Sequence, residues 1–296
     1  MATNFFALII FSYILYYLVI LPISVLPFNA LYAISDGLYF ILFRLIGYRK
    51  KVVINNLRNS FPAKSEAEIK TVASKFYKHL CDLIVESIKI FTISESEVKK
   101  RMVVINPELL DKYYNQNKSI IIAGGHYNNW ELFAVAIDAP IKHKSVAIYK
   151  PLSSKFFDKA MRKTRGKYGL QMISTKAVKD FFEATKELSA TIFAVDQSPS
   201  NPNSAHWMTF LNQSTGVLFG AERYAKKYNQ PVLFGHINKL KRGYYVVEFS
   251  LLTDNPVATE HGYITEQLMR LIEEDVLKQP EYWLWSHRRW KHKQPE

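Results

Sequence analysis

The sequence predicts an α/β fold, with a mixed, largely parallel sheet flanked by helices and an N-terminal membrane-anchoring helix. Strand-like apolar runs alternate with helical patterns along most of the chain, an order typical of parallel sheets. The first 35 residues carry no charged side chain. With 296 residues, 48% of them hydrophobic, and one cysteine, the chain can bury a core without disulfides. We therefore expect an anchoring segment over residues 1–45 and one globular domain over residues 46–296.

The anchor is predicted from Phe5–Phe28, a run of 24 residues without a charge. At ~1.5 Å per residue, a helix of this length can cross a hydrocarbon core of ~30 Å. Pro22 and Pro27 predict a bend, because proline removes a backbone donor from a helix. A bent crossing and insertion into one leaflet both fit. A buried core helix and a cleaved signal peptide are the alternatives, and the lack of a basic segment before the run disfavours the signal peptide.

The rest of the chain is strongly basic. Residues 44–296 contain all 39 Lys and Arg but only 25 acidic residues, a net charge of +14, which indicates anionic partners. Arg49, Lys50, Lys51 and Arg58 follow the apolar run, so the positive-inside rule places the globular domain in the cytoplasm. The same cluster is expected to meet an anionic membrane surface, at about 1 kcal/mol per base. A merely solvated helix face is the alternative.

The globular domain begins with a helix and continues with alternating elements. Ser65-x-x-Glu68 is a capping box that predicts a helix to about Phe91, and Ser94-x-x-Glu97 predicts a second short helix. Strands are expected at Ser119–Ala123, Ser145–Tyr149, Ala190–Val195, Val232–His236 and Tyr244–Ser250. Helices are expected at Asn129–Ile137, Ser154–Tyr168, Lys176–Lys186, Gly216–Tyr228 and Thr259–Leu277. The turn-like Lys239–Gly243 predicts that the last two strands form an antiparallel hairpin.

The sequence lacks the motifs of several common enzyme classes. There is no G-x-G-x-x-G, G-x-x-x-x-G-K-[ST], G-x-S-x-G or H-E-x-x-H pattern, and the histidines show no metal-ligand spacing. These absences disfavour nucleotide-binding, nucleophilic-serine and zinc enzymes. We expect neither a metal nor a cofactor.

One segment combines a buried strand, a glycine turn and a helix start: Ile120-Ile-Ile-Ala-Gly-Gly-His126-Tyr-Asn-Asn-Trp-Glu131. His126 falls at the carboxyl edge of the strand, where α/β sheets place their sites. With His126 in the loop and Glu131 in the first helical turn, the two side chains can meet. A carboxylate on one imidazole nitrogen raises the basicity of the other, which can then accept a proton from an alcohol. An ordinary loop histidine beside a dipole-stabilised glutamate is the alternative.

His126-x4-Glu131 within GGHYNNWE resembles the H-x4-D/E motif of the glycerolipid and lysophospholipid acyltransferase superfamily. The form G-H-x-x-N-W-E resembles the branch that contains the late acyltransferases of lipid A synthesis. Further segments resemble the family in order, at Tyr149–Leu152, Arg162 and Arg165, Asp196-Gln197, Phe210 with Thr215-Gly216, and Pro280–Lys291. Tyr127 and Lys150 depart from the usual Phe and Arg, and Lys150 weakens any bidentate anion clamp there.

The resemblance implies a membrane-anchored O-acyltransferase at the bacterial inner (cytoplasmic) membrane, with residues 46–296 as its acyltransferase domain. It implies transfer of a fatty acyl chain from a thioester, on acyl carrier protein, to a hydroxyl of a lipid A precursor. His126 is expected to be the general base and Glu131 its orienting carboxylate. The candidate substrate-binding residues are Asn129, Arg162, Arg165, Asp196 and Gln197. Asn129, Arg165 or backbone amides could donate to the developing oxyanion.

Other acceptors fit the same residues, among them a lysophospholipid or a hydroxyacyl aminolipid, and a non-catalytic membrane adaptor is a further alternative. The sequence does not separate acyl carrier protein from acyl-CoA as donor. The C-terminal run His287–Lys293 is predicted to contact an anionic lipid or the acidic carrier protein through Arg288, Arg289 and Lys291, rather than nucleic acid. Trp283, Trp285 and Trp290 fit either core packing or a membrane interface.

Overall fold

The computed structural model describes residues 10–295, so the Phe5–Ile9 part of the predicted anchor lies outside the described residues. Its centre is a seven-stranded sheet in the order β1-β9-β8-β2-β5-β3-β4. The strands are β1 (Met102–Val104), β2 (Ile120–Gly124), β3 (Lys144–Tyr149), β4 (Gln171–Ser174), β5 (Ser189–Ala194), β8 (Val232–Lys241) and β9 (Tyr244–Thr253). A separate hairpin consists of β6 (His206–Phe210) and β7 (Gln213–Val217).

The sheet is mixed and largely parallel, as predicted. β2 pairs in parallel with β5 and β8, and β3 with β4 and β5. β8 and β9 form the predicted antiparallel hairpin, and β1 runs parallel to β9. Strands β1, β4, β6 and β7 were not predicted, because three to five residues are too few for a clear pattern. The predicted helix at Gly216–Tyr228 begins only at Gly220, because Gln213–Val217 is strand β7.

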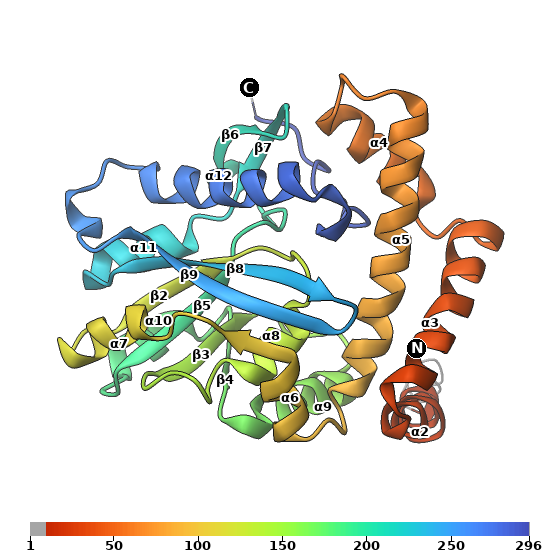
Figure 1. Cartoon of the computed structure of the whole chain (residues 1–296). Helices are drawn as coiled ribbons and strands as arrows, with labels where there is room; N and C mark the ends of the chain where they lie inside the picture. The colour runs from red at the N-terminus through yellow and green to blue at the C-terminus, as the bar shows by residue number, and fades with distance from the viewer. Residues whose placement is uncertain (1–9, 296) are drawn as a thin grey trace.

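Helices cover both faces of the sheet (Figure 1). The helices that follow the N-terminal region are α4 (Lys50–Ser60), α5 (Glu66–Lys89), α6 (Glu95–Arg101), α7 (Glu108–Asn115), α8 (Trp130–Ala136), α9 (Lys155–Arg165), α10 (Val178–Ala184), α11 (Gly220–Tyr228) and α12 (Tyr263–Lys278), of which α4 packs on α5. The capping box of Ser65 and Glu68 is present at the start of α5. Strand β2 is buried on both sides, since Ile121 packs into the cluster under α10, α11 and α12, and Ile122 into the cluster with α7 and α8.

The N-terminal region runs beside α5 (Figure 1). A helix at Ile10–Val25, which includes η1 (Leu15–Ile20) and α2 (Leu21–Val25), is followed by α3 (Phe28–Tyr39) and η2 (Phe40–Leu45). Within residues 10–295, no single helix is both long and apolar enough to cross a membrane. The pair Phe28–Leu45 and Lys50–Ser60 passes that test together but bends by 83°. The predicted spanning helix is therefore not established, although Phe11, Leu18 and many neighbours are exposed apolar side chains.

Candidate functional site

The candidate site lies where β2 and its neighbour β5 end. Gly124 at the end of β2 pairs with Ala194 at the end of β5, and Asp196 follows two residues later. Gly125 allows a close approach here, because a Cβ on it would lie only 3.2 Å from Asp196 Oδ2 and from Ile272 Cδ1. The glycine thus lets His126 approach the carboxylate of Asp196. Asn128, at φ 52°, turns the chain into α8.

Asp196 holds His126 through both its backbone and its ring. The His126 backbone N–H donates to Asp196 Oδ2 at 2.7 Å, and Nδ1 lies 2.6 Å from Oδ1. The Trp283 indole N–H also donates to Oδ2, at 2.8 Å. An ionised carboxylate can only accept, so His126 donates from Nδ1 and its neutral ring presents Nε2 as the acceptor. This arrangement suits proton abstraction from a hydroxyl.

The pKa values of the pair move apart. Burial alone would lower the pKa of His126, but the charge and hydrogen bond of Asp196, with a contribution from Glu131, raise it. Burial would raise the pKa of Asp196, yet His126 and the Trp283 indole bring it to about 2. Asp196 therefore remains ionised at neutral pH and keeps the imidazole basic.

Two polar side chains border the outward side of the His126 ring. Gln197 Nε2 lies 3.0 Å from His126 Nε2, where an acceptor hydroxyl would have to bind. His287 Nε2 accepts a hydrogen bond from the Ser198 backbone N–H at 3.3 Å, and burial lowers the pKa of His287 to about 4. His287 is therefore neutral near pH 7, and His126 is the more basic of the two histidines.

Glu131 is placed differently from the sequence prediction. Its carboxylate accepts two hydrogen bonds from Arg165 on α9, at 2.9 and 2.6 Å, and a third from the Trp130 indole. The carboxylate that orients His126 in this structure is Asp196. The sequence does not reveal the Asp196 contact, because a contact between two strand ends, 70 residues apart, leaves no local pattern. Glu131 and Arg165 nevertheless lie near His126, since both charges influence its pKa.

Asn129 caps α8 rather than facing a substrate. Its Oδ1 accepts from the Leu132 backbone N–H at 2.8 Å, and its amide donates to buried Glu86 at 2.5 Å. Glu86 also accepts from the hydroxyls of Tyr245 and Tyr32, at 2.8 and 2.9 Å. Asn129 is 1% exposed, so its predicted role as an oxyanion donor does not fit this geometry. It fixes the helix that carries Glu131.

The predicted basic residues have different surroundings. Arg162 forms an exposed ion pair with Asp158 one turn earlier on α9, and its role in substrate binding stays a prediction, whereas Arg165 pairs with Glu131. Arg289, expected on a docking surface, is 2% exposed and donates to the Gly216 carbonyl. Trp283 and Trp285 are likewise buried, so of the two alternatives for these tryptophans the structure supports core packing and not a membrane interface. Arg288 and Lys291 are exposed.

Residues that sequence reasoning passed over complete the site. They are Trp283 on Asp196, Trp130 at 5.1 Å from the His126 ring in an edge-to-face contact, and Glu86 beneath Asn129. Only Trp130 had a local signal, through its place in the G-H-x-x-N-W-E segment. Within residues 10–295, no three His, Cys, Asp or Glu side chains gather so that they could hold a metal ion.

Comparison with known proteins gives a consistent result. The family described as bacterial lipid A biosynthesis acyltransferase matches residues 1–292. A lipid A biosynthesis acyltransferase of Haemophilus influenzae is 23% identical over 270 residues, covering 90% of this chain and 86% of the relative. A lipid A biosynthesis lauroyltransferase of Escherichia coli is 22% identical, with 90% and 87% coverage. A lipid A biosynthesis palmitoleoyltransferase of the same species is 21% identical, with 82% and 79% coverage.

Proposed function

Because the chain belongs to the bacterial lipid A biosynthesis acyltransferase family, we propose that it transfers a fatty acyl chain from acyl carrier protein to a hydroxyl of a lipid A precursor. The observation that carries this proposal is the His126–Asp196 pair, which turns His126 Nε2 into a proton acceptor at the edge of the sheet. We place the protein at the bacterial inner membrane, with its acyltransferase domain facing the cytoplasm.

In the proposed reaction, His126 Nε2 takes the proton of the acceptor hydroxyl as its oxygen attacks the thioester carbonyl. A C–O bond forms, and the C–S bond breaks when the tetrahedral intermediate collapses. The departing thiolate takes the proton back from His126, which restores the neutral base. Asp196 stabilises the imidazolium in between. We assign two side chains to substrate binding. Gln197 lies beside the His126 ring, and Arg165 is hydrogen-bonded to Glu131.

The direct test supplies purified full-length protein, in neutral detergent, with lauroyl-acyl carrier protein and a tetra-acylated lipid A precursor. Mass spectrometry is expected to show a product heavier by one lauroyl ester, and none with His126→Ala. Lysophospholipid and hydroxyacyl aminolipid acceptors are tested in parallel, as is lauroyl-CoA. Acylation of only one of those other acceptors would overturn the lipid A assignment while leaving the acyl-transfer chemistry intact.

A second test concerns the anchor. Removing residues 1–26 is expected to shift the protein from the membrane fraction to the soluble or aggregated fraction, because most of the charge-free apolar run is lost. Fractionation followed by immunoblotting measures the shift. Washing membranes that contain the full chain with 1 M salt is the control for a purely electrostatic attachment. Release of the full chain by salt alone would show that the apolar run does not insert.

A further inference from the structure

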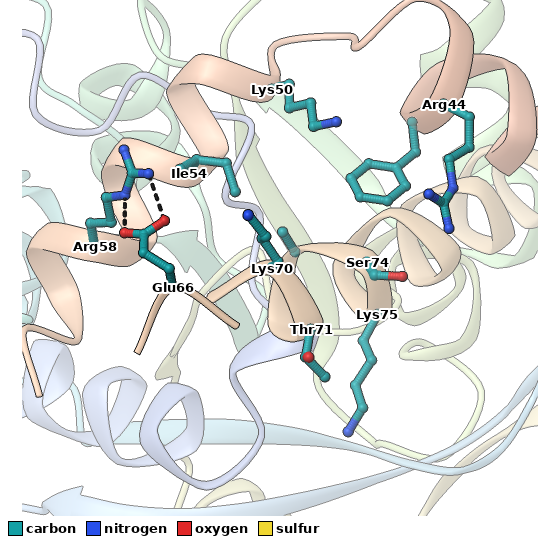
Figure 2. Close-up of a pocket in the computed structure, with 11 residues that line it drawn as sticks. Arg44, Lys50, Ile54, Arg58, Glu66, Lys70, Thr71, Ser74 and Lys75 are labelled. Carbon is teal, nitrogen blue, oxygen red and sulfur yellow. Dashed lines mark hydrogen bonds and ion pairs between the residues drawn. The ribbon is translucent and has the colours of Figure 1, made fainter. Parts of the chain in front are cut away.

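A basic pocket lies between α5 and the bend that joins η2 to α4. The bend passes through Gly47 and Arg49, which both have positive φ, and the cavity beside it measures about 520 Å³. Its charged lining residues are Arg44, Lys50, Arg58, Lys70, Lys75 and Glu66 (Figure 2). Five bases against one acid make this cavity a place for an anion.

Only part of this positive charge is neutralised within the protein. Arg58 forms a two-pronged ion pair with Glu66, with both distances 2.7 Å, and Lys75 points away toward Glu281 at 3.9 Å (Figure 2). Within residues 10–295, Arg44, Lys50 and Lys70 have no carboxylate within 4.0 Å. These three cations come from three elements and border one cavity, so an anion bound between them would relieve their mutual repulsion.

The surroundings of the pocket indicate what kind of anion binds. Phe40, Ile41, Leu45 and Ile46, on and directly after η2, are 42–67% exposed, so an apolar strip adjoins the cations. Phe43 contributes its ring to the cavity, with Lys50 Nζ 4.7 Å from the ring centroid. A ligand that matches both features has a negatively charged phosphate next to hydrocarbon chains.

We propose that this pocket binds the phosphate of an anionic phospholipid headgroup, with the acyl chains lying along the exposed strip of η2. The other face of α4 packs against the segment that follows Trp283, where Asn56 donates to the carbonyls of Trp285 and His287. The bound headgroup would thus hold α4, and with it the Trp285–His287 segment beside the site, at a fixed depth in the membrane. No lining residue hydrogen-bonds to His126, Asp196 or Gln197 in the described chain, so lipid binding can be measured separately from acyl transfer.

The test titrates the full-length protein in neutral detergent with dioleoyl phosphatidylglycerol and counts bound lipid by native mass spectrometry. Dioleoyl phosphatidylcholine and inorganic phosphate are the comparison ligands. The pocket variant is Lys50→Gln with Lys70→Gln, and the matched control is Lys176→Gln with Lys179→Gln near α10, which removes the same charge from other exposed positions. We expect one saturable phosphatidylglycerol, bound about tenfold or more tightly than phosphatidylcholine, and a loss of roughly tenfold or more in the pocket variant only.

Each other result overturns the proposal in a distinct way. Equal losses in both variants would mean nonspecific attraction by net charge. Inorganic phosphate binding as tightly as phosphatidylglycerol would identify a free-phosphate site. Normal lipid binding by the pocket variant, combined with a raised KM for acyl carrier protein, would identify a docking surface for the acidic carrier. The lipid-binding readouts do not require the acceptor assignment to be correct, since lipid binding is measured without turnover; only the KM comparison uses the acyl-transfer assay.

Discussion

His126 and His236 each have an aspartate on Nδ1, Asp196 at 2.6 Å and Asp275 at 3.0 Å. His236 Nε2 even lies 3.2 Å from the Ser250 hydroxyl, so Ser250, His236 and Asp275 have the connectivity of a serine-hydrolase triad. The two regions differ in their backbone. His126 follows the end of a parallel strand and a glycine turn, whereas His236 and Ser250 lie inside the paired strands β8 and β9.

The surrounding backbone decides what each pair can do. Ser250 lies opposite Phe234 in the β8–β9 ladder, so the backbone N–H groups of β9 that face β8 serve strand pairing and not an oxyanion. Asp275 belongs to α12, and its backbone carbonyl accepts from the hydroxyl of Tyr127, next to His126. We interpret the hydrogen-bonded pair His236–Asp275 as a structural contact that holds α12 against the sheet. A histidine–aspartate pair becomes a candidate base only where the strands end.

The largest expected effect separates the two histidines directly. His126→Ala should lower turnover by about 10²–10⁴-fold, the usual loss for a general base, while the protein still folds. His236→Ala should lower turnover only a few-fold but destabilise the fold by about 1–3 kcal/mol, because buried Asp275 loses its partner. Turnover and denaturant unfolding are measured on both purified variants. Near-normal turnover of His126→Ala would refute the mechanism.

The two aspartates provide the next test. Asp196→Asn should lower turnover by roughly 10²-fold, because the His126 tautomer is no longer fixed. A base acts unprotonated, so wild-type kcat/KM should fall as the pH drops through a His126 pKa above its ordinary ~6.5. Removing the charge of Asp196 lowers that pKa and moves the acid limb of the profile to lower pH.

Asp275→Asn is the control for that profile, because it changes the other pair by the same single charge. Its acid limb should coincide with that of the wild type. The comparison between the two pairs would fail if Asp275→Asn moved the limb and Asp196→Asn did not. Both profiles are recorded with saturating donor, so that differences in donor binding do not enter.

The smallest effect is expected for Glu131. Glu131→Gln removes the carboxylate that holds Arg165, and we expect a loss of about tenfold in kcat/KM with the acid limb moved slightly downward, since Glu131 helps to raise the His126 pKa. Combining Glu131→Gln with Arg165→Gln should cost little more than the worse single change, because the two side chains act as a pair. A loss as large as that of His126→Ala would restore Glu131 as the orienting carboxylate.

Much of the fold was predictable because it rests on local patterns. The strand at Ile120–Gly124, the capping box at Ser65 and the β8–β9 hairpin each have a signature within a few neighbouring residues. His126 was found for the same reason, as the residue after two glycines at a strand end. What could not be predicted is which carboxylate reaches it. Glu131 was expected in that role and Asp196 only in substrate binding, and the strand pairing between β2 and β5 brings Asp196 to the ring.

The exposure of basic side chains could not be predicted from the sequence either. The basic C-terminal run and the basic residues of α4 and α5 look alike as sequence, yet Arg289 is buried against the Gly216 carbonyl while Lys50 and Lys70 border an open pocket. Burial of Arg289 depends on the β6–β7 hairpin, which is too short to be predicted. Exposure therefore has to come from the tertiary structure.

The carboxylate of Glu86 affects how this protein can be shortened for experiments in water. It accepts one hydrogen bond from Tyr32 of α3 and one from Asn129, the cap of α8. A chain cut near residue 45 to remove the apolar segment would deprive a buried carboxylate of one of its three donors and uncover the side of α5. We expect such a soluble form to lose activity through a loosened α8, even with its substrates delivered in micelles. Soluble versions should therefore keep α3 and replace the exposed apolar side chains of η2 that follow it, such as Phe40 and Leu45.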